Sequence, residues 1–153
     1  MSLLLHAALE LIGHHGYAYL IDEGIAKARH LAGAVRSRPD FELLSDPHLN
    51  VVIYRYVPEA CRADVAAGRL SDEGRAQVDA FNRALQRVQL ERGRTFISRT
   101  TSAATVYGPD VPVVALRAVL ANPLTTFADI DAVLDDQVAL GAELAASGGW
   151  SAA

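Results

Sequence analysis

The chain has 153 residues, a formal net charge of −4, and a composition in which 51% of the residues are hydrophobic. This length and composition predict one folded domain with its own core, spanning residues 1–153, and exclude an intrinsically disordered chain. Acidic residues and arginines are mixed along the chain without a basic stripe, which argues against nucleic acid as a partner.

The apolar segments do not indicate a membrane protein. Charged residues or histidines interrupt every apolar run before it reaches the length of a membrane span. Residues 3–9 have no basic region before them and no cleavage site after them, so we interpret them as the start of a helix, not a signal peptide. A single cysteine, Cys61, excludes an internal disulfide framework and a cysteine-rich zinc site. It fits the reducing cytoplasm.

Two helical patterns occupy the first part of the chain. Residues 3–12 form a short pattern that ends at Gly13, so residues 1–16 are expected to be an N-terminal helix and turn. A longer pattern then places apolar residues every three or four positions until Pro39 stops it. Its stripe consists of Tyr17, Leu20, Ile21, Ile25, Ala28, Leu31, Ala32 and Val35.

The middle of the chain predicts two antiparallel strands and a helix. Residues 41–44 and 50–57 are the strands, separated by a turn that contains Pro47. Residues 59–72 have a mixed composition, for which we expect a loop with a helical turn. A helix then runs from about Glu73 to Arg92, with Gly93 as its C-cap.

The last third predicts two more strands and a final helix. The strands are residues 95–100 and 113–120, and the intervening residues 101–112 are rich in Ser, Ala, Gly and Pro, which predicts a mobile loop. Thr126 and Asp129 have the spacing of a capping box at the start of the last helix. Residues 146–153 are expected to fray.

Strand pairs that alternate with helices predict an α+β fold. We expect a small, mostly antiparallel sheet of about four strands, with helices packed on one face. The sequence shows no internal repeat and no low-complexity tract that would suggest another architecture.

Few residues indicate chemistry by themselves. Adjacent His14 and His15 would point about 100° apart on a helix, and no third ligand has a useful spacing, so we predict no metal site. Cys61 lacks an identifiable basic partner and is interpreted as a small apolar residue. Thirteen of the fourteen basic residues are arginines, and Lys27 is the single lysine.

Arg117 is the residue that physical reasoning selects. It is the one charge in the otherwise apolar stretch 113–120, and a buried charge requires a partner. One interpretation is an internal ion pair with Asp129 or Asp131. The other is a ligand carboxylate or phosphate, which the guanidinium fork of arginine can bind through two hydrogen bonds.

Three stretches of the chain, in order and at matching spacing, resemble the C-terminal small domain of group II pyridoxal-phosphate (PLP) dependent amino-acid decarboxylases, which act on glutamate, diaminobutyrate or aromatic amino acids. Asn82 in the third predicted helix also fits the resemblance. The matching residues are 13–17 with Ile21, Asp22, Ala28, Leu31 and Ala32; 41–44 and 49–58; and 93–98 with Leu116, Arg117, Asn122, Pro123, Thr126 and 129–131.

The resemblance implies fold type I of the PLP enzymes, and it also shows what the chain lacks. In this family the PLP-binding lysine follows a histidine on the large domain, which also carries the residues that hold the ring and the phosphate. Lys27 follows Ala26 in a helix, at a position expected to face solvent. We therefore predict no cofactor-binding residue and no PLP lysine in this chain.

The resemblance also implies a role for Arg117. In glutamate-decarboxylase members the matching arginine pairs with the side-chain carboxylate of the substrate. An arginine bound to the carboxylate that leaves as CO2 would stabilise the ground state, whereas one bound to a carboxylate that stays behind only positions the substrate. Relatives that act on aromatic or basic amino acids have the arginine too, so it does not name the substrate.

The sequence thus predicts a small subunit, or C-terminal half, of a split PLP-dependent amino-acid decarboxylase. It would be inactive alone and would complete the substrate pocket of a separate large chain that holds PLP, as a heterodimer or a dimer of heterodimers. Three alternatives stay open: a fragment of a full-length decarboxylase, a non-catalytic binding or regulatory module, and a complex that catalyses another PLP reaction at Cα.

Overall fold

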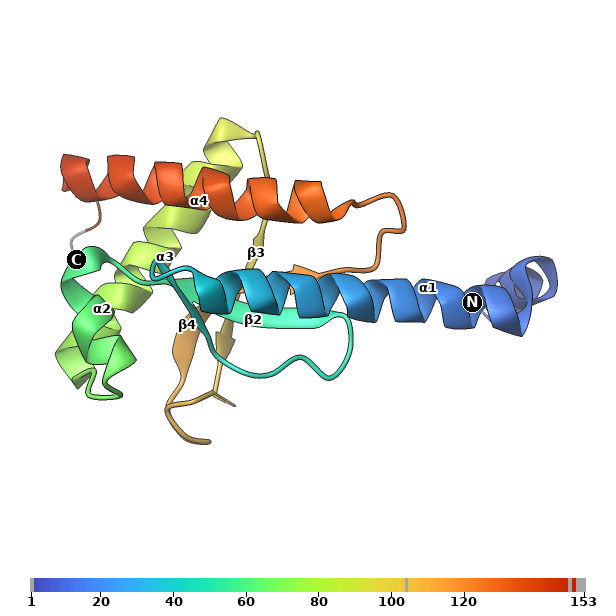
Figure 1. Cartoon of the computed structure of the whole chain (residues 1–153), viewed down its shortest axis with the longest axis horizontal. Coiled ribbons are helices and arrows are strands. Elements are labelled where there is room, and N and C mark those ends of the chain that lie inside the picture. The colour runs from blue at the N-terminus through green and yellow to red at the C-terminus, as the bar shows by residue number, and fades with distance from the viewer. Residues whose placement is uncertain (1, 104, 149, 151–153) are drawn as a thin grey trace.

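Four antiparallel strands form the sheet on which the helices pack (Figure 1). The computed structural model describes residues 2–103, 105–148 and 150. The strands are β1 (Phe41–Leu43), β2 (Val51–Tyr56), β3 (Ser98–Ser102) and β4 (Val113–Val119). They lie in the order β1-β2-β4-β3, and every neighbouring pair is antiparallel. The predicted α+β class and the small antiparallel sheet are confirmed.

The register of the two central strands separates their side chains into two sets. Tyr54 of β2 lies opposite Leu116 of β4, and Ile53 lies opposite Arg117. Side chains alternate between the two faces of a strand. The main core between the sheet and the helices therefore contains Val52, Tyr54 and Leu116. Ile53 and Arg117 lie on the other face, which we call the open face.

Helix α1 (Ser2–Ser37) is interrupted at Gly13, where φ is 73°. A left-handed backbone of this kind favours glycine, and it makes the predicted break between two helical patterns a kink at one residue. The predicted turn over residues 13–16 is therefore too long, because His14, His15 and Gly16 are helical.

The predicted apolar stripe on α1 is buried only in its second half. Ala28, Leu31, Ala32 and Val35 lie in the core. In contrast, Ile21 is 55% exposed, because the N-terminal half of α1 runs out past the sheet and past the last helix (Figure 1). The protein therefore presents a projecting helix whose apolar residues are not covered by its own domain.

The segment expected to be a loop with a helical turn contains a complete short helix, α2 (Glu59–Ala66). It brings Cys61 into a small apolar cluster with Val57, Leu70 and Val78. Burial raises the pKa of the Cys61 thiol, which keeps the sulfur protonated and agrees with its interpretation as a small apolar residue.

The last two helices begin close to where the sequence predicts, and the first of them ends at its predicted C-cap. Helix α3 (Asp72–Arg92) is capped by the Ser71 side chain and ends at Gly93 in the left-handed region. Helix α4 (Phe127–Ser147) starts with the predicted capping box between Thr126 and Asp129. These hydrogen bonds lower the pKa of Asp129. The caps fix where both helices cross the sheet.

The strand predicted over residues 95–100 lies further along the chain in the structure. Residues 95–97 precede β3, and Ile97 enters the core. At the other end of the chain, α4 continues through residues 146 and 147 of the segment expected to fray, and the Trp150 ring packs on the Phe81 ring at 5.2 Å. Gly149 and residues 151–153 lie outside the described residues.

Asn82 joins α3 to the sheet. Its Oδ1 accepts a hydrogen bond from Tyr56 N at 2.9 Å, and its Nδ2 donates to Tyr56 O and Val78 O, each at 2.8 Å. The side chain is completely buried. The amide thus uses its donors and its acceptor to hold the end of β2 against α3.

No helix among the described residues is both long enough and apolar enough to cross a membrane.

Replacing Asn82 with alanine is expected to lower the free energy of unfolding by about 1–3 kcal/mol, because Tyr56 N–H and C=O would lose their buried partner. Urea denaturation of both proteins would measure the difference. Arg87→Ala, an exposed change on the next turn of α3, is the matched control and should change stability by less than about 0.5 kcal/mol. Equal effects of the two changes would contradict this role for Asn82.

Candidate site on the open face of the sheet

Arg117 lies on the open face, and its side chain is exposed. The burial pattern along β4 explains this position: residues 113–116 are buried, whereas Arg117 and Val119 are not. The expectation of a buried charge in an apolar strand was therefore wrong. The first half of β4 is covered on both faces, but its second half is covered only on the helix side.

Ser98 of β3 is the hydrogen-bond partner of Arg117 among the described residues. The Ser98 hydroxyl donates to the Arg117 carbonyl oxygen at 2.6 Å, and Arg117 Nε donates to Ser98 Oγ at 3.4 Å. The two residues lie directly opposite each other in the strand register. Ser98 therefore accepts a hydrogen bond from Nε, while Nη1 and Nη2 of the guanidinium stay available to bind a ligand.

The internal ion pair considered for Arg117 is not formed. Asp129 accepts hydrogen bonds from the backbone and hydroxyl of Thr126, and Asp131 pairs with His30 Nε2 at 2.9 Å. No carboxylate of residues 2–103, 105–148 or 150 forms an ion pair with Arg117. The interpretation that remains is an arginine available to a ligand or a partner.

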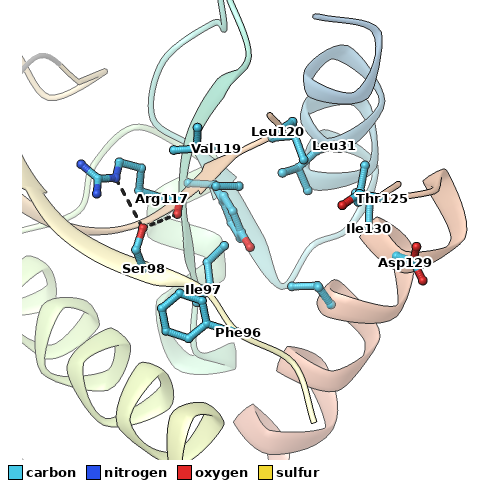
Figure 2. Close-up of a pocket in the computed structure, with 13 residues that line it drawn as sticks. Leu31, Phe96, Ile97, Ser98, Arg117, Val119, Leu120, Thr125, Asp129 and Ile130 are labelled. Carbon is cyan, nitrogen blue, oxygen red and sulfur yellow. Dashed lines mark hydrogen bonds between the residues drawn. The ribbon is translucent and has the colours of Figure 1, made fainter. Parts of the chain in front are cut away.

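A pocket of about 470 Å³ lies beside Arg117, between β4, α1 and the start of α4. Figure 2 shows the Arg117 guanidinium turned away from Leu31, Leu120 and Ile130, which line the pocket. The cavity is therefore mainly apolar, and the charge of Arg117 lies at its margin. Its lining is Leu31, Tyr54, Phe96, Ile97, Ser98, Arg117, Ala118, Val119, Leu120, Thr125, Asp129, Ile130 and Val133.

A second arginine of the open face, Arg55, is completely buried, and the sequence analysis missed it. Its Nε donates to Glu42 Oε2 at 2.7 Å, and its Nη2 donates to the Tyr107 hydroxyl at 2.5 Å. Tyr107 in turn donates to Glu42 Oε1 at 2.6 Å, and Asp79 Oδ1 lies 3.6 Å from Arg55 Nη1. The charge of Arg55 is thus compensated within the domain.

Tyr107 belongs to the segment that was expected to be a mobile loop. Residues 101 and 102 are the end of β3 instead. Further along, the backbone N–H of Val106 donates to Leu44 O at 3.1 Å, and Tyr107 packs against a small cluster that contains Leu44, Val113 and Ala115. Residues 105–112 therefore cover the Arg55 half of the open face and leave the Arg117 half uncovered.

Lys27 is buried, which corrects its predicted position on a solvent-facing side of the helix. It lies three residues after Gly24 and four before Leu31, both buried, so it shares their side of α1. Its Nζ donates to the carbonyl oxygens of Asn122 and Pro123 at 3.2 and 3.1 Å. The single lysine of the sequence is therefore already engaged, and the residues of this chain do not fit a covalent PLP site.

The other polar candidates do not form a site. The His14 and His15 rings lie 4.2 Å apart on the exposed part of α1. Within the described part of the chain, no group of three His, Cys, Asp or Glu side chains could hold a metal ion. Arg117 and Ser98 therefore remain the candidate site, because they lie together on the open face at the margin of the pocket.

Curated proteins with similar sequences are decarboxylases. The chain is 36% identical over 141 residues to an aspartate 1-decarboxylase of Aliivibrio fischeri, which matches 90% of this chain and 25% of the relative. It is 25% identical over 132 residues to the cysteine sulfinic acid decarboxylase of Rattus norvegicus, a match that covers 86% of this chain and 24% of the relative. No family model matches the chain.

The chain resembles the C-terminal small domain of group II PLP-dependent decarboxylases. The crystal structure of mouse CSAD in its apo form supports the fold: it has a TM-score of 0.75 and 24% identity, over 90% of this chain and 27% of that one. The chain spans about a quarter of the length of the relatives that it matches.

Asp79, which lies beside Arg55, makes the stability of the protein depend on pH. Burial raises the pKa of Asp79 above its ordinary value of 3.8 and outweighs the backbone hydrogen bond from Val114 and the attraction of Arg55. The folded protein therefore holds this proton more tightly than the unfolded chain, so the contribution of Asp79 to stability falls as pH rises from about 4 through the folded pKa.

Asp79→Asn should remove this dependence, because the amide has no charge to bury. Urea unfolding at a series of pH values from about 4 to 7 is expected to show the wild type losing stability relative to Asp79→Asn as pH rises. A stability difference that does not change with pH, or that changes in the opposite direction, would contradict the raised pKa.

Proposed function

We propose that this chain provides the small-domain part of a PLP-dependent amino-acid decarboxylase and completes the substrate pocket of a separate large chain that holds the cofactor. The observation that carries the proposal is the similarity to decarboxylases over one quarter of their length. The engaged state of Lys27 supports it, because the PLP lysine of such a reaction would then come from outside these residues. The chain alone would be inactive.

The projecting half of α1 is the surface that would bind the large chain. Six large apolar side chains of the described residues are exposed there, and Leu11 is 87% exposed. Apolar residues gathered in this way on one projecting helix are typical of a protein interface. We name them the α1 patch: Leu9, Leu11, Ile12, Tyr19, Leu20 and Ile21.

The large chain is the occupant of the α1 patch that we propose. The relatives of the present chain are about four times its length, so in them the remaining three quarters are available to cover this helix. In a split enzyme the same surface would be covered by a separate large chain. A heterodimer, or a dimer of heterodimers, would satisfy this requirement.

Arg117 would orient the substrate in the shared pocket. It is exposed, forms no ion pair with the described residues, and keeps two guanidinium nitrogens free. A side-chain carboxylate or sulfinate of the substrate matches this fork. The enzymes named for aspartate and for cysteine sulfinic acid both act on amino acids with an acidic side chain, which favours this class of substrate.

A second candidate is a fragment of a longer decarboxylase with the same fold. The quarter-length match fits this candidate equally well, and Arg117 would then serve the same pocket within one chain. The coding region separates the two. An adjacent, separate reading frame for a PLP-binding large chain supports the split enzyme, whereas one continuous frame supports the fragment.

Arg117→Ala is expected to reduce kcat/KM for an acidic amino acid about 10- to 150-fold, the equivalent of losing a charged hydrogen-bonded pair worth about 1.5–3 kcal/mol. The assay would use this chain co-expressed with the large chain encoded beside it, and would measure CO2 release from aspartate and cysteine sulfinate. The visible absorbance of bound PLP should remain unchanged. Arg117→Lys keeps the charge without the fork and should recover only part of the activity.

Unchanged turnover in Arg117→Ala would contradict the role of this residue. Activity of the large chain alone, at the rate of the complex, would contradict the need for the small chain altogether.

Leu11→Glu is expected to weaken binding to the large chain at least tenfold, because it places a charge in an apolar interface. Surface plasmon resonance with the immobilised large chain would measure the dissociation constant, and circular dichroism would confirm that the variant is folded. Arg87→Glu on exposed α3 is the control and should bind normally. Self-association of the wild-type chain through the α1 patch, with no binding to the large chain, would show that a second copy is the occupant instead.

A further inference from the structure

We propose that Ser98 is a positioning residue that fixes Arg117 for a substrate with an acidic side chain. The inference rests on the proposed function, and it assigns to Ser98 a specific task that it performs through Arg117. It also explains how an exposed arginine, which would otherwise sample many conformations, can act as a selective group.

The hydroxyl of Ser98 can serve Arg117 in one orientation only. Its single hydrogen is used in the 2.6 Å bond to the Arg117 carbonyl oxygen. The oxygen therefore presents a lone pair to Arg117 Nε, 3.4 Å away. Backbone and side chain of the same arginine are thus held by one group on the opposing strand, which restricts the rotations nearest the guanidinium.

This restraint determines which nitrogens a ligand can reach. With Nε directed to Ser98, the outer nitrogens Nη1 and Nη2 have no hydrogen-bond partner among the described residues, and Figure 2 shows them pointing outward from the strand. Two parallel N–H groups match the two oxygens of a carboxylate or sulfinate. A basic or purely apolar side chain offers no such pair of acceptors.

The charges of the open face point to the same ligand class. Arg55 is paired with Glu42 and lies beside Asp79, so its charge does not extend to a ligand. Arg117 has no such compensation in the described structure. Its cross-strand neighbour on β2 is the apolar Ile53, and its neighbour two residues along β4, on the same face, is the apolar Val119. A partner that covers this face would remove water and strengthen the attraction between Arg117 and an anion.

A purely structural role for Ser98 makes a different prediction, and β3 offers a matched control. Thr100 lies two residues from Ser98 on the same side of β3. Within the described part of the chain, its hydroxyl bonds only to the carbonyl of the adjacent Thr101, at 3.5 Å. Ser98→Ala and Thr100→Ala each remove one hydroxyl from this strand face. Only the first change removes a partner of Arg117.

The test uses the complex of this chain with the PLP-loaded large chain and compares Ser98→Ala, Ser98→Thr, Thr100→Ala and Arg117→Ala. For aspartate, Ser98→Ala should raise KM roughly 2- to 12-fold, as expected for one lost hydrogen bond, with kcat within about twofold. Ser98→Thr keeps the hydroxyl and should stay close to the wild type, as should Thr100→Ala.

A binding measurement without turnover provides the second readout. Succinate has both carboxylates of aspartate but no amino group, so it should bind without reacting. Isothermal titration calorimetry should show weaker succinate binding to the Ser98→Ala complex by the same factor as the rise in KM. Butyrate, which lacks the second carboxylate, should bind all the complexes equally weakly.

The outcomes distinguish the two proposals. If Ser98→Ala behaves like Thr100→Ala while Arg117→Ala loses activity, the positioning role is overturned and the function of Arg117 stands. If Arg117→Ala is fully active, the substrate role of Arg117 fails, and that of Ser98 fails with it. If Ser98→Ala lowers kcat for acidic and non-acidic amino acids alike, Ser98 is structural only and the inference is overturned.

Discussion

The buried guanidinium of Arg55 is the constraint on which the open face of the sheet depends. A charge with no exposure to water must be compensated by partners with good geometry, because its desolvation is otherwise prohibitive. The partners come from three parts of the chain: Glu42 from β1, Asp79 from α3 and Tyr107 from the segment before β4. Compensating the charge of this one side chain therefore fixes where three elements meet.

The two arginines of this face have opposite surroundings. Arg55 lies under residues 105–112 and is used by the fold, whereas Arg117 lies beyond that cover and is restrained by a single hydroxyl. The difference does not come from the residue type or from the strand pattern, which are alike. It comes from where the covering segment ends, and this is why only one of the two cations is available for recognition.

Much of the fold could be predicted from the sequence because it depends on local signals. Apolar periodicity, the capping box at Thr126 and the glycine at position 93 located the long helices, and the β-branched stretches located β2 and β4. The burial of Arg55 and Lys27 could not be predicted, because it depends on contacts between residues that are distant in sequence. Arg55 is separated from Tyr107 by 52 residues and Lys27 from Asn122 by 95, so no local pattern indicated these partners of the two cations. The alternation of Val51, Ile53 and Arg55 on one side of β2, with Glu42 opposite Arg55 in the register, was the one signal available for the first of these.

The position of Lys27 has a consequence for how the molecule could be studied. Acylating reagents that attack lysine amines have a single lysine to find in this sequence, and in the folded protein its amine lies beneath the carbonyls of Asn122 and Pro123. The rate of acylation of Lys27 would then measure how often the connection between β4 and α4 lifts away from α1. Because the sequence has no second lysine, acylation of lysine would report the opening of the segment between β4 and α4 alone.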